Sequence, residues 1–269
     1  MRRRKIGKGA NEQGMTLAIV LSGLVILAMI SVALLSRADR DVTLGANEVD
    51  RAKVAALVEG AIDTSILALF GPDTREALMR NDGLLPIVIA GTEITTRIGD
   101  VCGLWDLNHG AMPVFIRLLG RLGAPDPALT AEALSTARGV ETGLLSRRQL
   151  RALPGVDEQL YPRLSKEVTV NCRADRIDPS FASPLLLSAV PNLGRHTVET
   201  IVEQRRNGEI PPDLLVPHAE YLAPGPGQTY AIAATHALGP GSWVTRRVEV
   251  TLTHGPLEPY RILAWSTSE

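Results

Sequence analysis

The sequence predicts an α+β protein in which a long N-terminal helix precedes a small antiparallel sheet, and in which an all-helical insertion domain interrupts that sheet. Three observations lead to this prediction. Apolar residues recur at helical spacing from Thr16 to Phe70, with no proline among them. Short runs in which apolar and polar residues alternate follow at 84–98 and at 229–266. The stretch between these runs is rich in leucine, alanine and arginine, with prolines at positions that favour helix starts.

The first helix begins with an apolar segment that predicts a membrane span. No charged residue occurs between Met15 and Leu35, and five basic residues precede this run. At about 1.5 Å per residue the segment would be roughly 30 Å long, which matches the hydrocarbon thickness of a bilayer. By the positive-inside rule the basic end stays in the cytoplasm, and the rest of the chain lies on the other side of the membrane.

The helical pattern continues beyond the apolar segment. From Val42 to Leu69 apolar residues keep helical spacing, and charged residues occupy positions between them. We therefore expect one helix that extends to about Phe70, where the sequence GPDTRE ends it. Gly45 leaves an alternative open, because a glycine inside a helix costs about 1 kcal/mol and favours two helices with a bend.

The remaining patterns divide the chain into five parts. Strands are expected at 84–90, 92–98, 229–235, 243–253 and 259–266. The parts are a basic leader peptide (1–14), a transmembrane helix (15–36), the remaining helix with the first strands (37–101), the helical insertion domain (102–217) and the C-terminal strands that complete the sheet (218–269).

Two stretches of the insertion resemble each other. One begins at Cys102 and the other at Cys172, and each continues to an aspartate, a small polar residue, a proline and an apolar helix. Asp106, Asn108 and Asp178 are expected to build structural turns, since aspartate accepts backbone N–H bonds in Asx turns. If the two copies pack together, the cysteines form a disulfide worth about 4 kcal/mol in the loop-entropy model. The alternative is a pair of buried thiols.

A segment near the end of the insertion resembles a helix-hairpin-helix motif, whose DNA-binding versions offer backbone N–H groups and basic side chains to a phosphate. Arg195, His196, Arg205 and Arg206 would be the contacts. The charge distribution argues against nucleic acid as a partner. Residues 1–14 have a net charge of +4, so the rest of the chain carries −5 of the total of −1, whereas nucleic-acid surfaces need clustered positive charge. The alternative for this segment is a pair of packed helical hairpins.

Catalysis is not predicted. The five histidines share no metal-ligand spacing and have no obvious carboxylate partner nearby in the sequence. The chain has no nucleophile elbow, phosphate loop or dinucleotide fingerprint. The insertion has no dense carboxylate loop of the kind that holds a hard cation. We therefore expect no enzymatic activity and no cofactor, and we assign no metal ligands.

The N-terminus carries a more specific signal. Gly14 separates the basic leader from the apolar run that begins at Met15, and no small-x-small cleavage site follows the run. This arrangement resembles the class III signal of type IV pilins and type II secretion pseudopilins. The resemblance implies that a prepilin peptidase cuts the Gly14–Met15 bond on the cytoplasmic side and that methylation follows. It also implies that the helix from Met15 through Ile19 to Leu35 serves as membrane anchor and assembly helix.

Ile19 points to a particular place in such a filament. It is the fifth residue counted from Met15, where most pilins carry glutamate. That carboxylate is thought to neutralise the free amine of the neighbouring subunit in an apolar filament core, where an unpaired charge is very costly. Only the subunit at the tip has no neighbour above it. The absence of the acid therefore favours a tip subunit.

Several motifs sharpen this resemblance. They are Asp106-Leu107-Asn108, Leu153-Pro154-Gly155, Ile177-Asp178-Pro179 and Val190-Pro191. With the N-terminus, they make nearly the whole chain similar to the K subunit of the type II secretion minor pseudopilins (the general secretion pathway protein K family). The departure is Ser180, where the family often has asparagine.

The K-subunit resemblance implies a function and a location. The function is to form a filament-tip complex with I-type and J-type minor pseudopilins, to contact the major pseudopilin, and to prime a pseudopilus that aids export of folded proteins across the outer membrane. The location is the bacterial inner membrane, crossed once, with the body in the periplasm. Two alternatives stay open: a membrane-anchored DNA-binding uptake protein, and a minor subunit of a type IV pilus.

Overall fold

The protein is an α+β molecule, as the sequence predicts, and its computed structural model describes residues 10–139, 143–225, 227–253, 255 and 257–268. The helices are α1 (Ala10–Ala68), α2 (Thr74–Arg80), α3 (Met112–Leu122), α4 (Pro127–Arg138), α5 (Leu160–Leu164), α6 (Pro184–Ala189), α7 (Arg195–Arg206) and α8 (Pro212–Leu215), with 3-10 helices η1 (Val101–Gly103), η2 (Arg147–Ala152) and η3 (Val216–His218). The strands are β1 (Leu84–Ile89), β2 (Thr92–Asp100), β3 (Trp105–Asp106), β4 (Val168–Thr169), β5 (Thr229–Gly239), β6 (Ser242–Leu252) and β7 (Tyr260–Ser268).

The chain forms two compact units, residues 1–53 and residues 54–269. The described part of the first unit is helical and belongs to α1. Its large apolar side chains, from Leu17 to Leu34, are exposed. Among the described residues, no helix includes a stretch both long enough and apolar enough to cross a membrane.

The boundaries of α1 differ from the prediction at one end. The helix ends at Ala68, close to the predicted Phe70, and Gly45 lies within it. It begins at Ala10, inside the predicted leader, because no proline occurs between Ala10 and Met15 to prevent helix formation. Residues 1–9, the larger part of that leader, lie outside the described residues.

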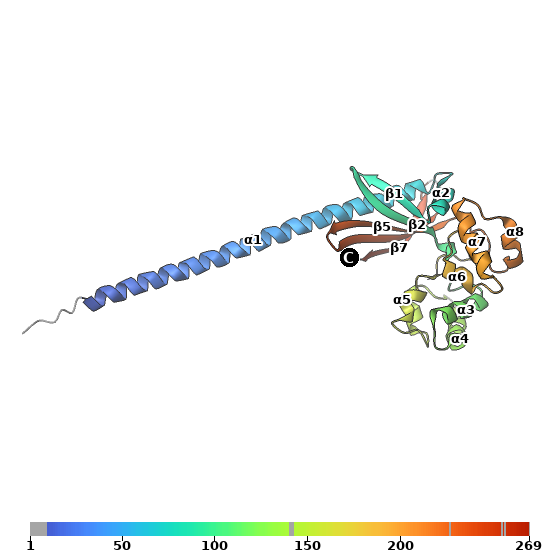
Figure 1. Cartoon of the computed structure of the whole chain (residues 1–269), viewed down its shortest axis with the longest axis horizontal. Helices are drawn as coiled ribbons and strands as arrows, with labels where there is room; N and C mark the ends of the chain where they lie inside the picture. The colour runs from blue at the N-terminus through green and yellow to red at the C-terminus, as the bar shows by residue number, and fades with distance from the viewer. Residues whose placement is uncertain (1–9, 140–142, 226, 254, 256, 269) are drawn as a thin grey trace, which may run out of the picture. The chain divides into compact units, whose positions relative to one another are not determined.

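The second unit contains a five-stranded antiparallel sheet in the order β1-β2-β5-β6-β7 (Figure 1). The five strands match the five that the sequence predicts. β2 and β5 are neighbours, with Ile98 opposite Ile232 and Asp100 opposite Tyr230. The insertion therefore leaves the sheet at the end of β2 and returns at the start of β5, at the same end of two paired strands.

One face of the sheet packs against the C-terminal part of α1. Alternate residues of the strands point to this face, among them Ile94, Ile232 and Val248, and they contact Ile62 and Ile66 of the helix. All five side chains are at most 1% exposed. The low aromatic content of the chain is consistent with this core, which is almost entirely aliphatic.

The insertion has a hydrophobic core of its own. Trp105 stacks on Phe115 with ring centroids 4.5 Å apart, and leucines of α3 and α6 surround them. The insertion is not all-helical as predicted, because β3 and β4 form a short parallel pair with Trp105 opposite Val168. Two residues per strand are too few to produce a readable alternation in the sequence.

The core between α1 and the sheet predicts a large difference between two adjacent residues. Ile66 is 1% exposed and Leu67 is 68% exposed. Ile66→Ala should lower the free energy of unfolding by about 2–5 kcal/mol because it leaves a cavity. Leu67→Ala, the matched control, should lower it by less than about 0.5 kcal/mol. Urea unfolding followed by near-ultraviolet circular dichroism measures both values, and equal losses would contradict this packing.

Candidate functional site

Most of the predicted site residues of the insertion lie where the chain leaves the sheet, namely Cys102, Cys172, Asp106 and Asp178. β2 ends at Asp100, and η1, which contains Cys102, follows at once. Cys102 forms a disulfide with Cys172, and their Cα atoms are 4.9 Å apart. Cys172 follows β4 closely in the chain. The disulfide therefore ties the first turn after the sheet to the middle of the insertion.

Asp106 organises the turn after β3. One carboxylate oxygen, Oδ1, accepts the backbone N–H groups of Asn108 at 2.8 Å and His109 at 2.9 Å. The other oxygen accepts the N–H of Arg173, the residue after Cys172, at 2.9 Å. Asp106 thus forms an Asx-type turn and reinforces the connection that the disulfide makes. His109 Nδ1 also lies 3.0 Å from Asp106 Oδ1, a carboxylate partner that the sequence analysis did not find.

Asp178 occupies the matching position in the second copy of the repeat. Its Oδ1 accepts the N–H of Ser180 at 2.9 Å, which reproduces the bond between Asp106 and Asn108. Its own backbone N–H donates to the carbonyl oxygen of Cys102 at 2.7 Å. Since the Asp178 side chain is fully buried, its second oxygen also needs a partner.

Asn108 holds a loop rather than the disulfide region. Its side-chain amide donates to the carbonyl oxygen of Leu144 at 2.9 Å, and its Oδ1 accepts the N–H of Leu144 at 2.8 Å. The Asn108 side chain thus bonds both the C=O and the N–H of Leu144, as the backbone of a neighbouring strand would. Gly143 has a φ of +59°, and a Cβ there would lie 2.7 Å from Asn108 Oδ1, so a larger residue would not fit.

Arg75, from α2, supplies the missing partner of Asp178. Its Nη2 donates to Asp178 Oδ2, and its Nη1 donates to Asp100 Oδ2 at 2.8 Å. Both carboxylate side chains are fully buried, while that of Arg75 is 29% exposed. Asp100 Oδ1 accepts the N–H of Cys102 at 2.9 Å. We call Arg75, Asp100 and Asp178 the junction triad, because it joins α2, β2 and the insertion beside the disulfide.

Burial controls the electrostatics of the junction triad. It raises the pKa of the Asp100 carboxyl above its ordinary value, although the hydrogen bonds from Arg75 and Cys102 oppose this. Burial also lowers the pKa of the Arg75 guanidinium, but the charges of Asp178 and Asp100 outweigh this and raise it. Two carboxylates share one guanidinium, so the triad carries excess negative charge in a desolvated place. Removing one member of such a buried group typically costs about 3–5 kcal/mol.

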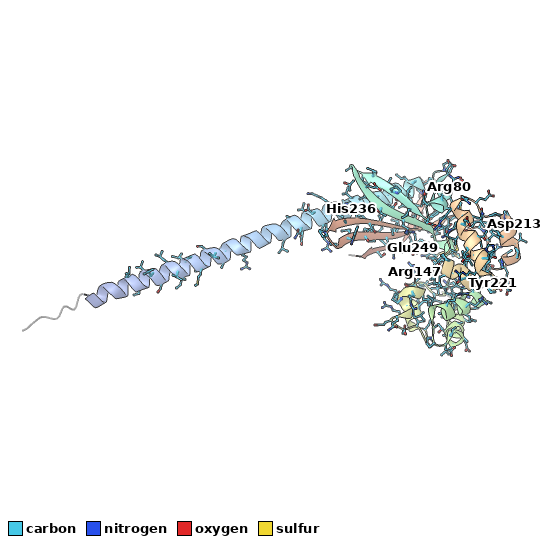
Figure 2. The ribbon with its side chains drawn as sticks, in the orientation of Figure 1. Arg80, Arg147, Asp213, Tyr221, His236 and Glu249 are labelled. Carbon is cyan, nitrogen blue, oxygen red and sulfur yellow. A yellow bond between two sulfur atoms is a disulfide. The ribbon has the colours of Figure 1, made fainter. Side chains whose placement is uncertain are left out.

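A second contact joins the sheet to the insertion. Glu249 lies on β6 and is 4% exposed. Its carboxylate accepts hydrogen bonds from Arg147 of η2 and, at 2.6 Å, from the amide of Asn171. Figure 2 shows Glu249 and Arg147 close together where the sheet meets the insertion. No pattern in the sequence indicates this contact, because Arg147 and Glu249 are 102 residues apart.

The polar groups of the junction contact one another and the backbone of the same chain. Its carboxylates accept hydrogen bonds from backbone N–H groups and arginines of the same chain. Within the described ranges, no three histidine, cysteine or acidic side chains are grouped so that they could hold a metal ion. The arrangement fixes the insertion to the sheet through the disulfide, the junction triad and the contact between Glu249 and Arg147.

The three arginines among the helix-hairpin-helix candidates have partners within the chain. Arg195 pairs with Glu199 at 2.8 Å, and Arg206 pairs with Asp82 at 3.0 Å. Arg205 donates to a backbone carbonyl at 2.7 Å and also lies 3.6 Å from Asp82. These contacts partly neutralise the positive charge that a phosphate would need.

The remaining predicted residues are all part of α1. Gly14, Met15, Ile19 and Leu35 lie within its bounds. The side chain of Ile19 is exposed. The candidate sites therefore belong to two separate regions, the N-terminal helix and the junction.

Comparison with known proteins finds a likeness to a solved structure. No protein-family model and no curated protein matches the sequence. The structure is similar to a chain in the crystal structure of the GspK-GspI-GspJ complex from the type 2 secretion system of enterotoxigenic Escherichia coli. The alignment covers 81% of this chain and 99% of that chain, with 14% identity and a TM-score of 0.46. At these values the likeness carries no argument about function.

The disulfide predicts a redox-dependent stability. Replacing Cys102 and Cys172 by serine should lower the free energy of unfolding by about 4 kcal/mol, because the unfolded chain regains the freedom of a long loop. Urea unfolding measures the loss. A reductant should destabilise the wild-type protein by a similar amount and leave the double variant unchanged. Equal stability of the wild type and the variant would contradict a role for the bond.

The raised pKa of Asp100 predicts a pH dependence. Because the native pKa lies above the unfolded one, the stabilising contribution of this group is complete below the unfolded pKa and is lost as the pH rises through the native pKa. The wild type should therefore gain stability relative to Asp100→Asn as the pH falls from about 7 towards about 4. Asp175→Asn, at a side chain that is 76% exposed, is the matched control and should follow the wild type. Urea unfolding at several pH values measures the differences, and a constant difference for Asp100→Asn would refute the assignment.

Proposed function

We propose that this protein is a minor pseudopilin of the K type, which sits at the tip of a type II secretion pseudopilus. The observation that carries the proposal is the composition of α1. One helix contains an uncharged apolar run directly after Gly14, and its C-terminal end packs in the core of a small antiparallel sheet. A pilin-like subunit needs these two parts, one for lipid and neighbouring subunits and one for its own body.

The exposed first part of α1 supports this role. Three of its large apolar side chains, those of Leu17, Ile19 and Met29, are each more than 60% exposed. The sequence has no charged residue between Gly14 and Arg37. Exposed apolar surface of this extent marks a membrane or protein contact, because leaving it in water costs roughly 25 cal/mol per Å². The inner-membrane location is part of the proposal and rests on the sequence from Met15 to Leu35.

The place of the insertion supports a tip position. The insertion is a body with its own core, attached beside the end of β2 and the start of β5. Such a bulky addition is difficult to stack within a tight helical filament, but it is tolerated on the last subunit. Ile19, which cannot neutralise the amine of a neighbour, agrees with this position. The partners are then I-type and J-type minor pseudopilins, with the major pseudopilin below and a prepilin peptidase as the processing enzyme.

The mature N-terminus tests the proposal. Mass spectrometry of protein purified from membranes of its native host should find a chain that begins at Met15 and is methylated there. Gly14→Val should keep its leader, because the peptidase must reach the bond after this residue. Gly23→Val, where a Cβ meets nothing within 4 Å, is the matched control and should be processed normally.

Two further results complete this test. Ile19→Glu should be processed and inserted like the wild type, because the substitution restores the residue that most pilins carry. Two short pilin-like proteins should co-purify with the wild type. A native chain that begins at Met1, or one recovered from the cytosol, would end the proposal, while a pilus protein as the main partner would favour the type IV alternative.

A further inference from the structure

A groove lies between the sheet and the insertion, with a volume of about 880 Å³. Its floor is formed by residues of β2, β5, β6 and β7, and its wall by residues of η2 and α5 with the turn that follows. The core residues of β6 point toward α1, so their neighbours Arg247 and Glu249 point to the opposite face. We call this space the basic groove.

Two rows of mostly small residues form much of the floor of the basic groove. These rows cross the paired strands, and all eight residues line the groove. The rows are Arg97, Ala233, Arg247 and Ser266, and Gly99, Ala231, Glu249 and Ala264. Apart from two arginines and one glutamate, no side chain in these rows is larger than that of serine. Such a surface allows an extended backbone to approach the sheet closely.

The wall adds more positive charge. It contributes Arg147, Arg148, Arg151 and Lys166 to the lining, together with Tyr161. The guanidinium of Arg151 lies 4.2 Å from the centre of the Tyr161 ring. The groove therefore combines cations with an aromatic surface, which suits a ligand that is both anionic and partly apolar.

The acidic residues of the lining are already occupied. They are Asp100, which pairs with Arg75, and Glu249, which pairs with Arg147 and Asn171. Within the part of the chain that the structure describes, Arg148 and Arg247 form no ion pair. The basic groove thus has an uncompensated positive charge, although the chain beyond its first 14 residues has a net charge of −5.

We propose that the basic groove binds an acidic peptide segment of another polypeptide in an extended conformation. Carboxylates of the segment would pair with Arg148 and Arg247, and its backbone would lie on the small residues of the floor. Nucleic acid is a poorer fit, since a duplex is too wide for a walled cavity of this volume and the acidic body repels a polyanion. The proposal does not depend on the filament role, because it concerns binding by the purified protein alone.

Fluorescence anisotropy with the full-length protein in detergent micelles tests this proposal. The probe is a fluorescein-labelled peptide of alternating glutamate and leucine. The double variant Arg148→Gln, Arg247→Gln should raise its Kd about tenfold, because two charge-assisted hydrogen bonds are lost. The matched control is Arg117→Gln, Arg121→Gln. It removes the same charge from two exposed arginines of α3 outside the groove and should change the Kd less than about twofold.

Three results would overturn the proposal. The first is equal affinity of the groove variant and the wild type for the acidic peptide. The second is equal binding of a peptide in which glutamine replaces glutamate, since charge would then play no part. The third is tighter binding of labelled duplex DNA than of the peptide, which would identify nucleic acid as the ligand. The proposal is supported if the affinity for the acidic peptide falls when salt is added, and if it falls for the groove variant but not for the control variant.

Discussion

The sharing of one guanidinium by two buried carboxylates is the constraint on which the body of this protein depends. Asp100 ends a central strand, Asp178 begins a turn in the insertion, and Arg75 comes from the short helix after α1. The two buried carboxylates depend on Arg75 for their counter-charge in this desolvated place. The neighbouring disulfide acts on the same connection but chiefly through the unfolded chain, so the two effects are complementary.

The constraint explains how two separate hydrophobic cores form one unit. The core under α1 and the core around Trp105 are distinct clusters. The junction triad, the disulfide and the contact between Glu249 and Arg147 join the insertion to the sheet. The contact between Glu249 and Arg147 lies at the edge of the basic groove and contributes to its lining. The groove therefore lies where charged side chains join the insertion to the sheet.

Contacts between residues that are close in the sequence can be predicted from it, whereas contacts between distant residues cannot. The turns at Asp106 and Asp178 depend on residues two positions away, so the repeat predicted them. The strands were predicted because alternation over several residues is a strong signal, whereas two-residue strands such as β3 give none. The role of Arg75 was missed because its partners are 25 and 103 residues distant. The sequence predicts the start of α1 near Thr16, whereas the helix begins at Ala10. The prediction is too late because the expected cleavage at the Gly14–Met15 bond does not itself interrupt a helix.

The pairing of β2 with β5 means that the sheet does not need the insertion for its register. Asp100 and Tyr230 face each other across antiparallel strands, where a short reverse turn could close a simple hairpin. The insertion is then comparable to a domain added at a loop, and its length and surface can diverge while the framework stays unchanged. A change in the insertion can therefore alter the lining of the basic groove while the strands keep their register.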